Sequence, residues 1–240
     1  MQRPNRLALP HLALFAIACT PAVGLAQTQV GSQPVVGPRD AALVASALIL
    51  LPIPELTGIN SDPVACVPCD PSTVNAFDRW AIAPPRPAVI TASDLVRLGI
   101  TAFTWTDLAN EGPRGRAGIV ASVESYVWAA SAVNLTKGLV GRKRPVLYTE
   151  EGIEVADVVT NQRSWPSGHA ATSAALATSY CLTLRDLADG GADFRCWLAV
   201  AGAVGVGVLR VAAAKHFPTD VLAGWAAGVG AAFAVHAIKF

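Results

Sequence analysis

Two groups of residues in this chain have the types and spacing that an anion-binding site requires. Lys137 and Arg144 are seven residues apart, which is two helical turns, so we expect both to project from one face of a helix that Pro145 ends. A solvated basic helix end would look the same. The run 166–169, Pro-Ser-Gly-His, predicts a helix start whose free backbone N–H groups point outward, as an anion site requires. Taken alone, such a helix start is common.

A third group lies near the C-terminus and carries the strongest signal. Arg210 lies inside the apolar run Trp197–Ala214, where a charge is costly and usually functional. His216 follows in a predicted bend before Pro218, and Asp220 falls in the first turn of the next predicted helix. A carboxylate beside an imidazole orients the ring and stabilises its positive form.

Together the three groups indicate one kind of chemistry. Permanent cations and helix-start amides bind a tetrahedral dianion, and two histidines can divide the roles of nucleophile and proton donor. The whole chain has 18 Lys and Arg against 17 Asp and Glu, a net charge of +1, so it has no global field for a polyanion. We therefore expect no nucleic-acid partner and a locally bound anion.

The three groups resemble the signature motifs of the type 2 phosphatidic acid phosphatase superfamily, which also includes bacterial nonspecific acid phosphatases and vanadium-dependent haloperoxidases. The motifs occur here in order as Lys137-x6-Arg144-Pro145, Pro166-Ser167-Gly168-His169 and Arg210-x5-His216-x3-Asp220. The resemblance covers about residues 93–238. The family usually has Ser before the third-motif Arg, whereas this chain has Leu209, which predicts the loss of one phosphate hydrogen bond.

The resemblance also implies a role for each residue. His216 would attack phosphorus to form a phosphohistidine, and Asp220 would hold its other ring nitrogen. His169 would protonate the leaving oxygen and later activate water. The phosphate-binding groups would be Lys137, Arg144, Ser167, Gly168 and Arg210. No metal and no other cofactor is expected, because these cations neutralise the charge that collects on the phosphate oxygens.

The elements that position these residues are predicted to be helices, since no alternation long enough to indicate a strand occurs. We expect an all-α helical bundle with a five- to six-helix core. Ser93 is a predicted N-cap, and Gly224 and Gly228 suit close helix packing. The predicted helices cover about 93–108, 117–141, 167–184, 197–214 and 221–238.

Composition favours a membrane-embedded bundle with membrane lipid as a partner. Hydrophobic residues make up 52% of the chain and charged residues 15%, where about 25% charged is usual, and the mean hydropathy is +0.44. The segments 92–108, 117–138, 168–184 and 197–214 are expected to span, with 221–238 as a fifth. Several are shorter than the ~20 residues a span needs, and 41–51 is too short, so a soluble bundle stays open as an alternative.

The N-terminal third is predicted to lie outside the catalytic core. Residues 1–26 have the pattern of a secretory signal peptide, 27–92 form an extension with a cysteine-containing loop, and 93–240 form the phosphatase helical core. Cys66 and Cys69 are expected to form a disulfide rather than a redox pair or a zinc site. The positive-inside rule favours a bacterial inner membrane with the active site facing the periplasm. In a soluble periplasmic protein, Cys181 and Cys196 could bridge their shared turn.

The predicted function is a phosphatase that hydrolyses a phosphate monoester or a pyrophosphate, such as phosphatidate or a polyprenyl pyrophosphate, through a phosphohistidine. Its partner would be a lipid phosphate or another phosphomonoester. A soluble periplasmic nonspecific acid phosphatase is the first alternative. A vanadium-dependent haloperoxidase-like enzyme and a noncatalytic membrane scaffold are the others.

Overall fold

Eight α-helices and four short 3₁₀ helices make up the described part of the chain, which contains no strand. The computed structural model describes residues 37–60, 62, 64–188 and 193–240, so the predicted signal segment 1–26 lies outside the described residues. The predicted all-α fold is confirmed. Beyond α1 (Pro38–Leu50), α2 (Ile53–Thr57) and α3 (Ala76–Arg79), the long helices are α4 (Pro87–Asn110), α5 (Gly112–Val140), α6 (Gly168–Leu187), α7 (Phe194–Ala212) and α8 (Pro218–Lys239).

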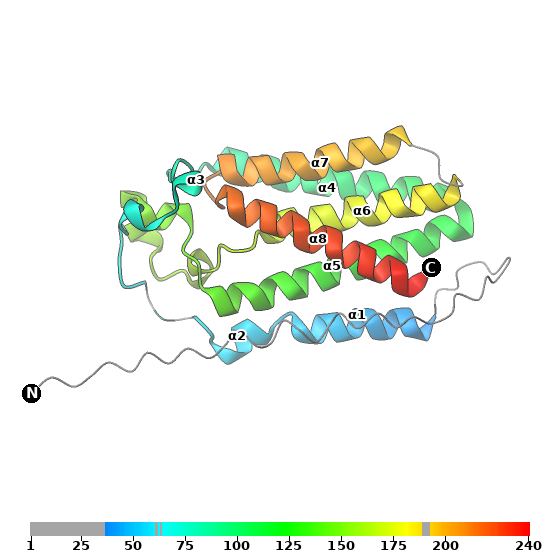
Figure 1. The fold of residues 1–240 in the computed structure, drawn as a ribbon, viewed down its shortest axis with the longest axis horizontal. Coiled ribbons are helices and arrows are strands. Elements are labelled where there is room, and N and C mark those ends of the chain that lie inside the picture. The colour runs from blue at the N-terminus through cyan, green and yellow to red at the C-terminus, as the bar shows by residue number, and fades with distance from the viewer. Residues whose placement is uncertain (1–36, 61, 63, 189–192) are drawn as a thin grey trace, which may run out of the picture. The chain divides into compact units, whose positions relative to one another are not determined.

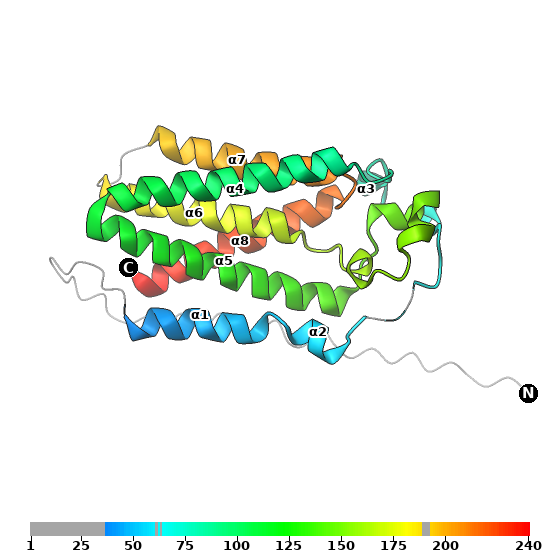
Figure 2. The same cartoon turned by 180° about the vertical axis from the view of Figure 1, so that it is seen from behind.

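Consecutive long helices run in opposite directions, so their connections gather at two ends of the bundle (Figures 1 and 2). One end holds the start of α6, the start of α8, the end of α5 and the end of α7. The 3₁₀ helices η2 (Pro145–Tyr148), η3 (Glu150–Val155) and η4 (Val159–Gln162) connect α5 to α6 at this end, and α3 lies there as well. All three sequence motifs therefore meet at one end.

Helix α6 is the centre of the bundle, and its small side chains let the neighbouring helices approach closely. Almost every residue from Ala170 to Leu184 is buried. On α8, a Cβ added at Gly224 would lie 2.5 Å from the Ser167 carbonyl oxygen, and one at Gly228 would lie 2.0 Å from the Ala171 carbonyl oxygen. The close packing predicted for both glycines is confirmed.

Polar side chains hold α1 against α5. The Ser131 hydroxyl donates to the Ala47 carbonyl oxygen at 2.6 Å, and the Asn134 amide donates to the Leu51 carbonyl oxygen at 2.6 Å. Near the C-terminus, the Lys239 ammonium pairs with the Asp40 carboxylate on the first turn of α1. The Ala47 carbonyl oxygen also accepts from the Leu51 N–H at 3.2 Å, so it is shared between the end of α1 and Ser131 of α5.

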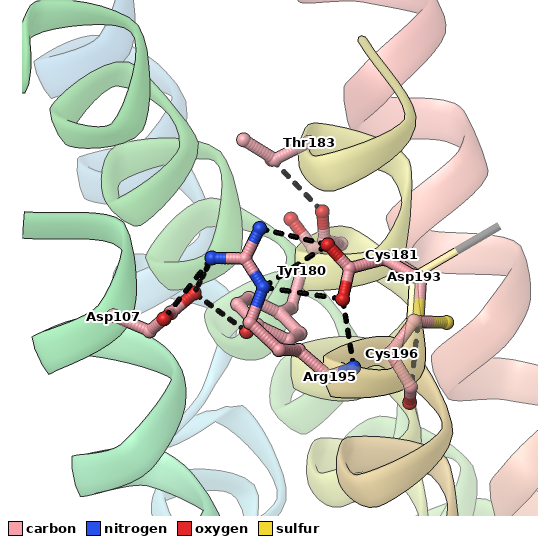
Figure 3. Close-up of a disulfide and its surroundings, with 8 residues drawn as sticks. Asp107, Tyr180, Cys181, Thr183, Asp193, Arg195 and Cys196 are labelled. Carbon is pink, nitrogen blue, oxygen red and sulfur yellow. Dashed lines mark hydrogen bonds and ion pairs between the residues drawn. A yellow bond between two sulfur atoms is a disulfide. The ribbon is translucent and has the colours of Figure 1, made fainter. Parts of the chain in front are cut away.

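The end of the bundle opposite the motifs is tied by a disulfide and an ionic cluster (Figure 3). Cys181 on α6 is bonded to Cys196 on α7. The adjacent Arg195 guanidinium lies within 3.0 Å of carboxylate oxygens on three residues, Asp107, Glu111 and Asp193. The connection between α6 and α7 is therefore linked to α4 as well.

Three segments of the described chain are long and apolar enough to cross a membrane, which is consistent with a membrane-embedded helical bundle: Pro38–Thr57, α7 and α8. The first of these segments is longer than the apolar run 41–51, because α1 begins at Pro38 and α2 follows after Pro52. That 41–51 by itself does not span stays a prediction. The segments 92–108, 117–138 and 168–184 are helical but do not meet this measure of length and hydropathy.

Ser93 does not have the predicted N-cap position. Helix α4 begins at Pro87, which occupies the first helical position, so Ser93 lies in the second turn and is fully buried. A Pro at this position starts a helix without losing a hydrogen bond, because the first N–H groups have no partner inside the helix. The boundary between extension and core at residue 93 stays a prediction.

The close approach of α8 to α6 predicts opposite effects for two neighbouring glycines. Gly228→Ala places a methyl group against the backbone of α6 and is expected to lower the stability of the protein by about 1–3 kcal/mol. Gly230→Ala is the matched control, because nothing lies within 4 Å of its added Cβ. It should be neutral or stabilising by up to about 1 kcal/mol. Thermal unfolding of the purified variants measures both, and equal melting temperatures would contradict the packing.

Candidate active site

His216 is the buried centre of the site. It lies in the bend between α7 and α8, with 1% of its surface exposed, and α8 begins two residues later at Pro218. The Asp220 Oδ2 atom lies 3.5 Å from His216 Nδ1. The same oxygen accepts hydrogen bonds from the Ser164 hydroxyl at 2.5 Å and from the Phe217 N–H at 2.9 Å. Asp220 is therefore held rigidly beside the imidazole.

Three cations converge on His216 from different elements. Lys137 approaches from the last turn of α5. The Lys137 Nζ atom lies 3.6 Å from the position that a Cβ added at Gly168 would occupy. Arg210 is buried in the last turn of α7, and Arg144 precedes η2. The Nε atoms of both arginines are buried and have no hydrogen-bond acceptor in the described residues. Donors of this kind are suited to bind an anion.

The sequence predicted that Lys137 and Arg144 project from one helix face, but in the structure they do not lie on the same helix. Helix α5 ends at Val140, because Gly141 adopts the left-handed conformation with φ 61° and closes the helix with a hydrogen bond to the Lys137 carbonyl oxygen. Arg144 instead follows an irregular segment, where its N–H donates to the Asn161 carbonyl oxygen at 2.8 Å. The two cations meet because the chain turns back at Gly141.

Burial and neighbouring charges determine the ionisation of His216 and Arg144, which both lie outside the helices. Burial lowers the pKa of His216 well below its usual range, and the positive charges of Arg144, Lys137 and Arg210 lower it further. Burial lowers the pKa of Arg144 to about 10, with a smaller contribution from Arg210, so this side chain stays charged at neutral pH. The imidazole is therefore uncharged, which is the form that can act as a nucleophile.

His169 lies in the first turn of α6 and faces a carboxylate that the sequence analysis had not singled out. Its Nε2 atom lies 2.9 Å from Asp94 Oδ1 on α4, and Arg210 Nη1 lies 3.8 Å from the same oxygen. The Arg210 guanidinium also donates to the Ser93 hydroxyl at 3.2 Å. Asp94 therefore orients the second histidine and one of the cations together.

The starts of α6 and α8 are joined directly. The Ser167 N–H donates to the Asp220 carbonyl oxygen at 2.8 Å, and Ser167 is the N-cap of α6. Its hydroxyl is 3.5 Å from the Ala170 N–H, a weak contact. Gly168 follows as the first helical residue, so its N–H is free of a helical partner. The hydrogen bond between Ser167 and Asp220 therefore fixes the second motif against the third.

The extension before residue 93 supplies a further part of the site. Asp78, on α3, is fully buried and accepts hydrogen bonds from Arg142 Nη2 at 2.7 Å and from the Thr219 hydroxyl at 2.5 Å. Arg142 Nη1 in turn donates to Asp220 Oδ1 at 2.6 Å. Burial alone would raise the pKa of Asp78, but these hydrogen bonds, with one from Asn75, hold it below its usual value.

Three site residues lie outside the predicted motifs: Asp94, Ser164 and Asp78. They differ in how far the sequence marks them as functional. Asp94 is a charge on a largely apolar helix, which is a recognisable mark of function. Ser164 directly precedes the second motif. Asp78 lies in a stretch rich in Pro, Asp and Cys that the sequence alone indicates as a loop, where a single acidic residue has no distinguishing pattern. Leu209, which replaces the usual Ser, is partly buried on α7 and supplies no hydrogen-bonding group to the site.

An open cleft of about 420 Å³ leads to the site. It is lined by the site residues Lys137, Gly168 and His169. Further lining residues are Glu55 on α2, Arg97 on α4, and Tyr126 and Asn134 on α5. Cys66 and Cys69 form a disulfide in the loop at this end of the bundle. The arrangement of a neutral buried imidazole among three cations, with a second histidine at the cleft, is suited to transfer of a phosphoryl group through a histidine.

The comparison with protein families agrees with this class of site. A family model described as the PAP2 superfamily matches residues 118–240, just over half of the chain. The chain therefore belongs to the PAP2 superfamily, which confirms the resemblance inferred from the three motifs and supports a phosphatase at the level of reaction class. No curated protein and no solved structure matches the chain.

The contacts of Asp78 predict that the extension takes part in positioning the site. Asp78→Asn removes the negative charge behind Arg142, and we expect kcat to fall about tenfold, because one lost hydrogen bond to a charged group corresponds to about 1.5–3 kcal/mol. KM should change little, since Asp78 does not line the cleft. Steady-state kinetics with an aryl phosphate measures both constants.

Asp70→Asn is the control for this variant. Asp70 lies in the same loop, is exposed and caps only η1 (Pro71–Thr73). An Asp78 variant as active as the Asp70 variant would show that the extension does not support Asp220.

Proposed function

We propose that the protein is a phosphatase that releases phosphate from a lipid phosphate monoester or pyrophosphate through a phosphohistidine at His216. The observation that carries this proposal is the uncharged, fully buried His216 enclosed by the three cations Lys137, Arg144 and Arg210. A metal-independent phosphatase needs a nucleophile that is neutral while its surroundings are positive.

The geometry supports a two-step reaction. In the first step, the imidazole nitrogen of His216 that does not face Asp220 attacks phosphorus, and the bond from phosphorus to the leaving oxygen breaks. His169 gives its proton to that oxygen. In the second step, His169 takes a proton from water, whose oxygen attacks the phosphohistidine and releases phosphate. The three cations bind the equatorial oxygens, where charge collects in both transition states.

Exposed apolar side chains favour a substrate that resides in a membrane. Helix α7 exposes Trp197 (66%) and Val208 (56%), and helix α8 exposes Leu222 (51%) and Phe233 (53%). Large apolar side chains exposed on long apolar helices are typical of surfaces that contact lipid or another protein. A phosphate headgroup at the membrane surface could enter the cleft while the apolar helices remain in contact with lipid.

One observation favours the soluble periplasmic phosphatase as a second candidate. Disulfides lie at both ends of the bundle, Cys66–Cys69 near the site and Cys181–Cys196 at the opposite end. If the bundle crossed an inner membrane, one end would face the cytoplasm, where thiols stay reduced. Two disulfides therefore support a bundle that lies wholly on the oxidising side.

Phosphate release separates a phosphatase from a noncatalytic scaffold. Purified protein is expected to release phosphate from phosphatidate and from soluble monoesters, and His216→Ala should lose at least about a thousandfold in kcat, as the loss of a nucleophile does. His236→Ala is the matched control, because His236 pairs with Asp186 at 3.2 Å, on α6 near the end opposite the site. Equal release by the His216 variant and the wild type would contradict the proposal.

The state of the cysteines in intact cells separates the two arrangements. A soluble bundle wholly in an oxidising compartment predicts that a membrane-permeable maleimide leaves Cys181 and Cys196 unlabelled until a reductant is added. Mass spectrometry of the labelled peptides measures this. Labelling of Cys181 and Cys196 with Cys66 and Cys69 still protected would instead show that the bundle crosses the membrane.

A further inference from the structure

The cleft at the site continues into a second hollow. Arg97 on α4 and Tyr126 on α5 line the cleft together with His169, and both also line an adjoining hollow of about 250 Å³ between the two helices. The other lining residues of this hollow are mostly apolar: Leu98, Thr101, Trp105 and Val123. A ligand can therefore extend from the site past Arg97 onto an apolar surface.

Arg97 is a cation that the described part of the chain does not pair with a carboxylate. Its only hydrogen bond there runs from Nη1 to the Tyr126 hydroxyl at 2.9 Å. Its Nε atom is buried and has no acceptor. A guanidinium carries five donors, so most of those on Arg97 are free to bind a ligand. Because these free donors belong to a cation that lines the open cleft, they are suited to bind an anion there.

The position of Arg97 relative to His169 indicates which part of a substrate it would meet. Asp94, which contacts His169, precedes Arg97 by three residues on α4. Arg97 therefore lies on the same helix face, about one turn farther from the site end of the bundle. Since His169 is proposed to protonate the leaving oxygen, the group attached to that oxygen extends toward Arg97.

We propose that Arg97 and Tyr126 form a second anion subsite, which binds the phosphate retained on the leaving group of a diphosphate ester whose apolar chain lies in the adjoining hollow. This inference rests on the proposed phosphatase activity of the same site. A monoester leaves as a neutral alcohol and offers Arg97 no anion. A diphosphate ester leaves as a phosphate monoester, whose charge Arg97 would stabilise.

The reaction at this subsite is a hydrolysis and needs no further reactant. The nitrogen of His216 forms a bond to the terminal phosphorus, and the bond from that phosphorus to the bridging oxygen breaks. The bridging oxygen takes the proton of His169 and stays on the product monoester at Arg97. Water then hydrolyses the phosphohistidine and returns a proton to His169. One diphosphate ester and one water thus give one monoester and one phosphate.

Paired substrates with the same prenyl chain test the subsite by kinetics. The wild type is expected to have a higher kcat/KM for the diphosphate than for the monophosphate. Arg97→Gln should lower kcat/KM for the diphosphate about tenfold or more, and change that for the monophosphate less than about twofold, because the lost contact is a charged hydrogen bond. Arg97→Lys should restore part of the preference. Arg86→Gln, an exposed position on the N-terminal side of α4, is the control and should change neither value.

The outcome distinguishes failure of the subsite from failure of the proposed function. Equal losses for both substrates, or no loss for either, would overturn the subsite. Calorimetry with inorganic pyrophosphate and inorganic phosphate gives a readout independent of turnover: Arg97→Gln should weaken binding of pyrophosphate only. If the wild type hydrolyses neither substrate, the proposed function fails. In that case calorimetry alone tests the subsite: weaker pyrophosphate binding by Arg97→Gln supports it, and unchanged binding overturns it.

Discussion

Mutual repulsion among three cations around one buried imidazole is the constraint on which the rest of this structure depends. Lys137, Arg144 and Arg210 all act electrostatically on His216, and each is partly or wholly removed from water. Such a cluster is stable only if nearby carboxylates offset its charge and fixed contacts prevent its side chains from moving apart. Asp220 and Asp94 are the carboxylates that contact the histidines and so provide this balance.

The helical bundle meets this constraint by bringing one cation from each of three separate elements. Lys137 arrives on α5, Arg210 on α7 and Arg144 on the segment that leads into η2. The close packing of α8 on α6 at Gly224 then sets the distance between the second and third motifs. The extension adds Asp78, which fixes Arg142 and through it Asp220. Arg142 and Arg210 therefore contact carboxylates, whereas Lys137, Arg144 and Arg97 have no carboxylate partner in the described part of the chain.

The sequence was sufficient for features that depend on local pattern. The bend at His216, the helix start at Pro218 and the helix start within 166–169 follow from residue type and neighbouring residues, and the structure has all three. The common helix face of Lys137 and Arg144 was wrong, because the left-handed conformation of Gly141 ends α5 before Arg144. The predicted cap at Ser93 was wrong because Pro87 starts α4 earlier. Contacts between distant segments, such as Asp78 with Arg142, leave no pattern in a single sequence.

The central claim is that His216 forms the covalent bond to phosphorus, and direct detection of that bond tests it most closely. Protein mixed with an aryl phosphate, quenched within milliseconds in alkali and digested, is expected to yield the peptide containing His216 with one added phosphoryl group by mass spectrometry. The modification should disappear when the substrate is exhausted. Turnover of the same substrate with no phosphoryl group on His216, or with the group on His169 instead, would contradict the account.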